Sequence, residues 1–128
     1  MDKSEFQYRT KAFAINIETF CKTLPYDFIK DYIAQLIRSS SSVAANYRSA
    51  CRAKSKADFV NKMRIVEEEP DESMLFLELI FELYQKKREE IKILHNKANE
   101  LLSMTVSSIN TVLKSSEKST IANRQSKF

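Results

Sequence analysis

The residues of this chain best suited to binding chemistry are the cations of the stretch 38–62. They are Arg38, Arg48, Arg52, Lys54, Lys56 and Lys62. Guanidinium groups bind carboxylates and phosphates through paired hydrogen bonds, and ammonium groups attract phosphates as point charges. The stretch therefore predicts one of two kinds of site: contacts with the phosphates of RNA or DNA, or ion pairs with acidic groups of the same chain or of a neighbouring subunit.

The first of these cations share a predicted helix face with small side chains. At about 100° per residue, a helix over 29–52 turns its large apolar side chains to one side and a polar face to the other. The polar face holds Arg38, Ser42, Ala45, Arg48 and Arg52. Because serine and alanine let another backbone approach closely, we expect the part around Arg38 to lie in an interface. The exposed part beyond it is the candidate for nucleic acid.

A run of carboxylates follows the cations directly, at Glu67, Glu68, Glu69, Asp71 and Glu72. We expect Arg38 to pair with this run. The predicted oligomer interface is Arg38, Ser42, Ala45, Glu68, Asp71 and Glu72. The predicted nucleic-acid-binding residues are Arg48, Arg52, Lys54, Lys56 and Lys62.

The overall charge is a weaker signal than this local polarity. Residues 114–128 hold four cations against one carboxylate, so most of the formal net charge of +4 lies there. The rest of the chain is an electric dipole, with cations up to Arg64 and carboxylates directly after it.

Enzymatic chemistry has little support in the residues. A diiron bundle needs two Glu-x-x-His motifs, but His95 is the one histidine and Lys92 precedes it by three. Arg88 and His95 lie two helical turns apart, as in helical ribonucleases of the HEPN type, so a ribonuclease remains an alternative. The acidic run lacks the histidine or glycine loop that would shape a metal site. We predict a protein that is not an enzyme, with no cofactor, no metal and no small-molecule substrate.

The elements that must position these residues are helices. The chain has no glycine and two prolines, Pro25 and Pro70, and its apolar residues recur every three or four positions. This pattern predicts helices over 8–24 and 27–52, and a third that starts after a capping box at Ser55 and Asp58. The third helix is predicted to continue through Pro70 with a kink, although a break at Glu69 is the alternative.

A turn near 85–88 and a fourth helix up to Lys114 complete the predicted domain, residues 1–114. Residues 115–128 are predicted to form a flexible basic tail, since they are polar and lack periodicity. The fold class is all-α, an antiparallel up-and-down four-helix bundle.

The two cysteines and the absence of long apolar runs bear on the compartment. Cys21 and Cys51 lie at apolar helical positions, which predicts reduced, buried thiols. No secretory leader or membrane span is visible near Met1 or elsewhere, so we expect a cytoplasmic protein without membrane contact.

Several segments resemble the bacterial four-helix bundle proteins, also called the 23S rRNA intervening-sequence proteins. They are Ser42–Arg48, Ala50–Ser55, Ile65–Glu69, Leu77–Leu79 and Ala98–Leu101. The resemblance implies small homo-oligomeric bundles, typically pentameric rings. It also implies a relation to the accessory proteins of diversity-generating retroelements, which are thought to bind nucleic acid through a basic surface. Pro70 departs from the family pattern, which has alanine there.

These observations lead us to expect a non-enzymatic homo-oligomer, a pentamer by the resemblance, that binds RNA or DNA as an accessory module. The alternative is a structural or protein-binding oligomer with no affinity for nucleic acid.

Overall fold

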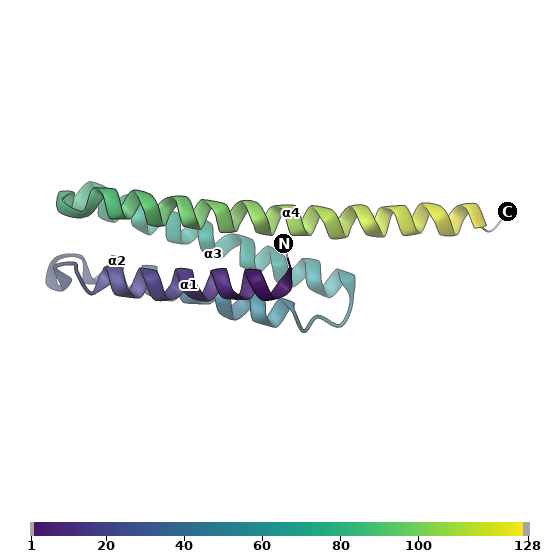
Figure 1. Cartoon of the computed structure of the whole chain (residues 1–128), viewed down its shortest axis with the longest axis horizontal. Coiled ribbons are helices and arrows are strands. Elements are labelled where there is room, and N and C mark those ends of the chain that lie inside the picture. The colour runs from purple at the N-terminus through teal and green to yellow at the C-terminus, as the bar shows by residue number, and fades with distance from the viewer. Residues whose placement is uncertain (1, 127–128) are drawn as a thin grey trace.

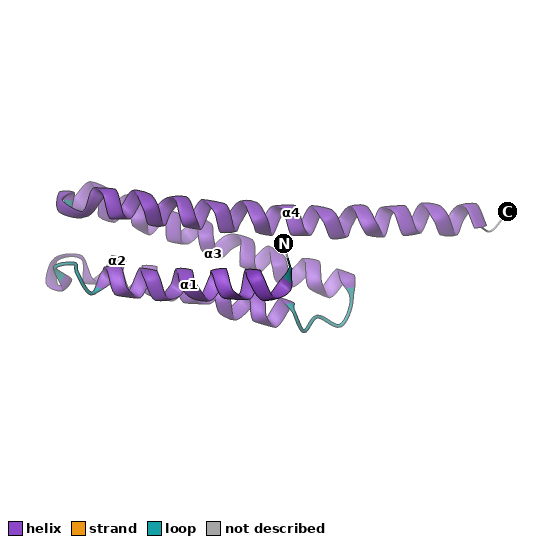
Figure 2. Ribbon diagram, viewed as in Figure 1, coloured by secondary structure: helices purple, strands orange, loops and turns teal. Residues whose placement is uncertain are grey.

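The computed structural model describes residues 2–126, and every regular element in that range is helical. Figures 1 and 2 show long helices that run up and down side by side, joined by short connections. The all-α class and the four-helix bundle are thereby confirmed. The elements are α1 (Lys3–Cys21), α2 (Tyr26–Ala50), α3 (Lys56–Leu83), the 3₁₀ helix η1 (Gln85–Lys87) and α4 (Arg88–Ser126).

The starts of α1 and α3 are set by side-chain caps. The carboxylate of Asp2 accepts a hydrogen bond from the Glu5 N–H at 2.7 Å, so α1 begins at Lys3, ahead of the predicted start at Tyr8. Ser55 Oγ accepts the Asp58 N–H at 3.0 Å, and Asp58 in turn accepts the backbone N–H of Lys54 at 3.0 Å. The predicted start of α3 at a serine cap is therefore confirmed. The Asp58 carboxylate binds the N–H of Lys54, one residue before the cap, and so also holds the α2–α3 connection in place.

Each helix buries one apolar stripe in a shared core. α2 packs against α1 and α3, α3 packs against α4, and of these neighbouring pairs the contact between α1 and α4 is the sparsest. Ile17, Leu36, Leu77 and Ile109 are fully buried, one from each long helix. Burial of a side chain of this size stabilises the fold by about 1.5–3 kcal/mol.

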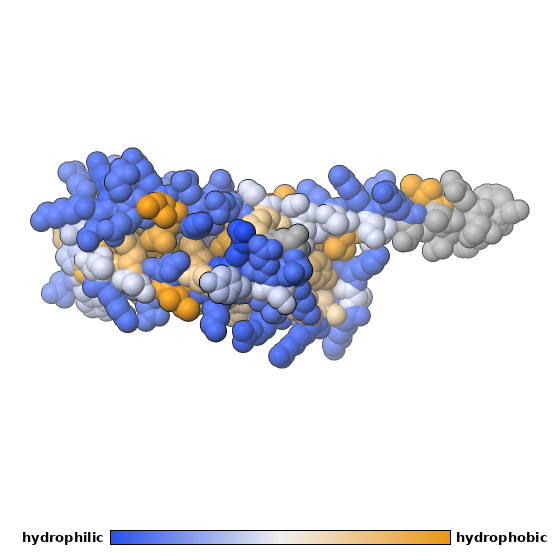
Figure 3. All heavy atoms as spheres, in the orientation of Figure 1, coloured by the Kyte–Doolittle hydropathy of each residue, from blue (hydrophilic) through white to orange (hydrophobic). Residues whose placement is uncertain are grey.

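The sparse contact between α1 and α4 leaves a groove of about 410 Å³, whose lining includes Tyr8, Phe13 and Leu101. In Figure 3, apolar atoms are visible along this seam, while hydrophilic side chains cover most of the rest of the same face.

α3 and α2 each contain a residue that could interrupt a regular helix. α3 is one helix through Pro70, as preferred from the register of the stripe; the kink itself stays a prediction. In α2, the backbone of Ile29 leaves the helical region (φ −127°, ψ 25°), and the helix bends there. The sequence pattern contained no signal for this bend.

α4 is much longer than the bundle that it packs against. At about 1.5 Å per residue, its 39 residues span about 58 Å, whereas the 19 residues of α1 span about 28 Å. α4 therefore extends past the other helices (Figure 1). We call residues 113–126 the projecting segment.

The predicted end of the fourth helix at Lys114 is wrong, because α4 continues to Ser126. Most residues of the projecting segment are polar, but it has no glycine or proline and half of its residues are good helix formers, so a helix already nucleated by packing can continue through it. The flexibility of residues 115–128 and the domain boundary at 114 stay predictions, and residues 127 and 128 lie outside the described range.

Candidate nucleic-acid interface

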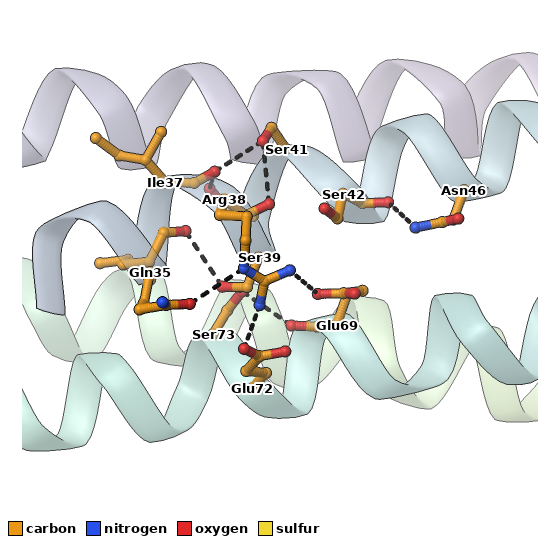
Figure 4. A network of polar contacts seen from close by, with 12 residues as sticks. Gln35, Ile37, Arg38, Ser39, Ser41, Ser42, Asn46, Glu69, Glu72 and Ser73 are labelled. Carbon is orange, nitrogen blue, oxygen red and sulfur yellow. Dashed lines mark hydrogen bonds and ion pairs between the residues drawn. The ribbon is translucent and has the colours of Figure 1, made fainter. Parts of the chain in front are cut away.

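Arg38 is the centre of a polar network between α2 and α3 (Figure 4). Its Nη2 donates to the carboxylate of Glu72, and its Nη1 lies 3.6 Å from Oε2 of Glu69. Its Nε donates to Oε1 of Gln35 at 3.1 Å. Arg38 thus pairs with the acidic run within its own chain, which is one of the two pairings that the sequence left open.

The small residues next to Arg38 bring the two helices together. Ser39 Oγ and Ser73 Oγ are 2.8 Å apart, and both side chains are fully buried. Ser73 Oγ also lies 2.9 Å from the carbonyl oxygen of Glu69, and Ser39 Oγ lies 3.2 Å from that of Leu36. One hydroxyl therefore donates its proton to the other, which in turn donates to its own carbonyl, and both side chains are hydrogen-bonded. Part of the small-residue surface of α2 therefore serves close approach within the chain.

The network affects the ionisation of Arg38 and Glu69 differently. The hydrogen bond to Glu72 raises the pKa of Arg38, which stays cationic. Burial raises the pKa of the Glu69 carboxyl above its ordinary value, although the nearby Arg38 opposes this shift. The buried Glu69 Oε2 has no hydrogen-bond partner among the described residues, because Arg38 Nη1 is too distant for one.

The other predicted interface residues remain at the surface of the single chain. Ala45 is exposed, and Ser42 is half-buried with its carbonyl accepting Asn46 Nδ2 at 2.8 Å. Glu68 and Asp71 are exposed and form no ion pair within residues 2–126. Their role between subunits stays a prediction.

The predicted nucleic-acid-binding residues gather at the end of the bundle where α2 meets α3. Arg48, Arg52, Lys54 and Lys56 are exposed, and none forms an ion pair with a described carboxylate, although the charge of Lys54 acts on nearby Asp58. Lys62 differs, because its Nζ lies 3.4 Å from Oδ2 of Asp58. The hydrogen bond from the Lys54 N–H lowers the pKa of that carboxyl, and Lys62 adds to the effect.

The neighbouring surface holds cations that sequence reasoning missed. Lys11 of α1 and Arg48 of α2 line one groove of about 450 Å³, together with Gln7, Ser41 and Ala45. Lys3 Nζ donates to the carbonyl of Cys51 at 3.2 Å. Helical periodicity describes the faces of one helix, so it held no signal that α1 places its cations beside the end of α2.

The two residues of the ribonuclease alternative have separate contacts with α3. His95 Nε2 lies 3.0 Å from Oε2 of Glu78. Arg88 Nε donates to the carbonyl of Phe81 at 3.1 Å, and its guanidinium lies 4.6 Å from the centre of the Phe81 ring. Both contacts hold the first turns of α4 against the end of α3.

The cysteines are free thiols. Burial raises the pKa of Cys21 to about 12, so this thiol stays protonated at neutral pH. Cys51 is half-buried, less enclosed than predicted. Within residues 2–126, no His, Cys, Asp and Glu side chains group as they would around a metal ion. No helix in that range combines the length and apolar character needed to cross a bilayer.

Comparisons with known proteins bear on the whole four-helix body. A family model described as 23S rRNA-intervening sequence protein matches residues 3–107. One similar solved structure is a protein of unknown function from the S23 ribosomal protein family of Bacteroides thetaiotaomicron. It is 31% identical, with a TM-score of 0.74, over 81% of this chain and 97% of its own. A comparison with curated proteins finds no match.

Proposed function

Since this chain belongs to the family of 23S rRNA-intervening sequence proteins, we propose that it is a homo-oligomeric, non-enzymatic accessory module that binds RNA. The observation that carries the proposal is the cluster of exposed cations at Arg48, Arg52, Lys54 and Lys56, which form no ion pair with a described carboxylate. Lysine and arginine in this state bind phosphates by releasing counterions. We expect the protein to carry out this role in the cytoplasm.

Assembly into an oligomer, a pentamer by the resemblance, is supported by the surface beside Arg38. Small side chains at Ser42 and Ala45 would admit a second copy, and Glu68 and Asp71 offer carboxylates that the chain itself leaves without an ion pair. Ala45→Arg should therefore lower the mass measured by sedimentation. Asn99→Arg, which adds the same side chain at an exposed position of α4, should leave the mass unchanged.

The RNA proposal is tested by comparing two pairs of lysines. Lys54 and Lys56 lie in the cation cluster, whereas Lys30 and Lys86 are exposed, lack ion pairs among the described residues and lie near the opposite end of the bundle. K54Q/K56Q should weaken binding to a structured RNA and reduce the salt slope of log K by about 1–2, because two phosphate contacts are lost. K30Q/K86Q removes the same charge and should leave the affinity for RNA and the salt slope nearly unchanged.

Fluorescence anisotropy with a labelled RNA hairpin at several salt concentrations measures both quantities. Equal effects of the two double variants would contradict the assignment of the site. Absence of binding by the wild type at moderate salt would leave the alternative, a structural or protein-binding oligomer with no affinity for nucleic acid.

A further inference from the structure

The cations without an acidic partner are distributed unevenly over the molecule. Within the side chains that the structure describes, three of them, Lys30, Lys86 and Arg88, lie near the connections at one end, where Arg88 contacts the carbonyl and ring of Phe81. All the others lie toward the opposite end, where α2 meets α3. They are Lys3, Lys11, Arg48, Arg52, Lys54, Lys56, Lys114 and Lys118.

Two contacts join these cations into one surface. Lys3 Nζ reaches the carbonyl of Cys51 at 3.2 Å, which ties the start of α1 to the end of α2. Lys56 Nζ reaches Ser115 Oγ at 3.2 Å, which ties the start of α3 to the projecting segment. Figure 1 shows the N-terminus and the α2–α3 connection at the end of the bundle from which α4 projects. We call this surface the cationic end.

The acidic residues at this end are mostly engaged. Asp2 caps α1, Glu5 pairs with Arg9, and Asp58 pairs with Lys62. Glu117 is the carboxylate of the projecting segment, where Lys114 and Lys118 outnumber it. The cationic end therefore carries a net positive charge on its bundle part and on its helical extension.

A row of exposed hydroxyl groups on α4 leads toward the projecting segment, where lysines continue it. Ser103, Ser107 and Thr111 follow one another every fourth residue along α4, and Lys114 and Lys118 continue the same face. The three hydroxyl residues also line a cavity of about 530 Å³ beside Phe6 of α1. Hydroxyl groups can exchange hydrogen bonds with ribose 2′-hydroxyls and donate to phosphate oxygens.

Exposed aromatic rings are scarce at the cationic end. Tyr26 and Phe28 are 62% and 71% exposed, but they lie at the start of α2, at the opposite end. Tyr8, 73% exposed, lies between Lys3 and Lys11 on α1, but it lines the groove between α1 and α4 and not the groove that Lys11 and Arg48 share. Proteins that bind single strands stack bases on aromatic rings, whereas duplex RNA is recognised through phosphates and 2′-hydroxyls.

From these observations we propose that the cationic end binds the backbone of base-paired RNA, with the hydroxyl and lysine row of α4 lying along the duplex. This inference rests on the proposed function and specifies its ligand. It adds Lys3, Lys114 and Lys118 to the binding residues. The projecting segment thereby acquires a role, because it lengthens the charged surface beyond the packed body.

The test uses the full-length protein and three labelled probes: a 20-base-pair RNA duplex, one of its strands chosen to be unstructured, and a DNA duplex of the same sequence. Anisotropy titrations at several salt concentrations should show binding to the RNA duplex at least about tenfold tighter than to the single strand. K114Q/K118Q should weaken duplex binding severalfold and lower its salt slope by about 1–2. K30Q/K86Q should do neither, and sedimentation should show the same assembly for all variants.

The outcomes distinguish failure of the duplex inference from failure of the proposed RNA-binding function. Equal or tighter binding of the single strand, or full duplex affinity in K114Q/K118Q, would overturn the duplex inference while RNA binding stood. Equal affinity for the DNA duplex would overturn the assignment to RNA. Failure to bind any of the probes would overturn the proposed function itself.

Discussion

Glu69 is a carboxylate whose ionisation the fold opposes. Its side chain is 14% exposed, and burial raises its pKa even though Arg38 lies 3.6 Å away. A carboxyl with a raised folded-state pKa contributes stability below its unfolded pKa and loses that contribution as the pH rises through the folded value. Ionisation of Glu69 in the folded chain therefore removes stability that the neutral carboxyl contributes.

The variant Glu69→Gln should show this penalty directly. The amide keeps the shape of the side chain without the charge, and Arg38 retains its hydrogen bond to Glu72. In urea unfolding experiments at several pH values, E69Q should be at least as stable as the wild type at pH 7, and the difference should shrink toward pH 4. A variant that loses more stability at pH 7 than at pH 4 would contradict this account.

At the scale of the element, the serine cap of α3 stabilises the α2–α3 connection. Ser55→Ala removes the oxygen that accepts the Asp58 N–H, and loss of a serine cap costs about 1 kcal/mol. Ser49→Ala is the matched control, because Ser49 is exposed near the end of α2 and its side chain forms no hydrogen bond within the described chain.

Urea midpoints of the two variants measure the difference. S55A should unfold at a lower urea concentration than S49A, with no change in the slope of the transition. Equal midpoints would mean that the cap contributes nothing to the connection that carries Lys54.

At the scale of the whole molecule, the packed body and the projecting segment should be separable. Removal of residues 115–128 takes away part of α4 beyond the end of the bundle, together with the hydrogen bond from Lys56 to Ser115. The chain 1–114 should melt cooperatively within a few degrees of the full chain, because one exposed hydrogen bond contributes about 1 kcal/mol.

Calorimetry and sedimentation of the shortened chain check this expectation. A large loss of thermal stability, or a change in assembly, would show that the domain does not end near residue 114 as the sequence predicts.

The helical elements and much of their chemistry were predictable from local patterns. Apolar stripes indicated the bundle, Ser55 and Asp58 indicated the start of α3, and the charge pattern indicated that Arg38 would pair with the acidic run. These features depend on residues close together in the chain or on complementary charge. The length of α4 was missed because a polar segment lacks the periodicity by which a packed helix is recognised.

The sequence by itself thus determined which residues form helices, which faces are apolar and which stretch is cationic. Only the tertiary structure decided that Ser39 meets Ser73 inside one chain, that Lys3 reaches Cys51, and that Lys56 reaches Ser115. The reason is geometric: each pair joins different helices, and its distance depends on how far each helix extends and how closely its neighbour packs. The pattern within a single helix contains neither quantity.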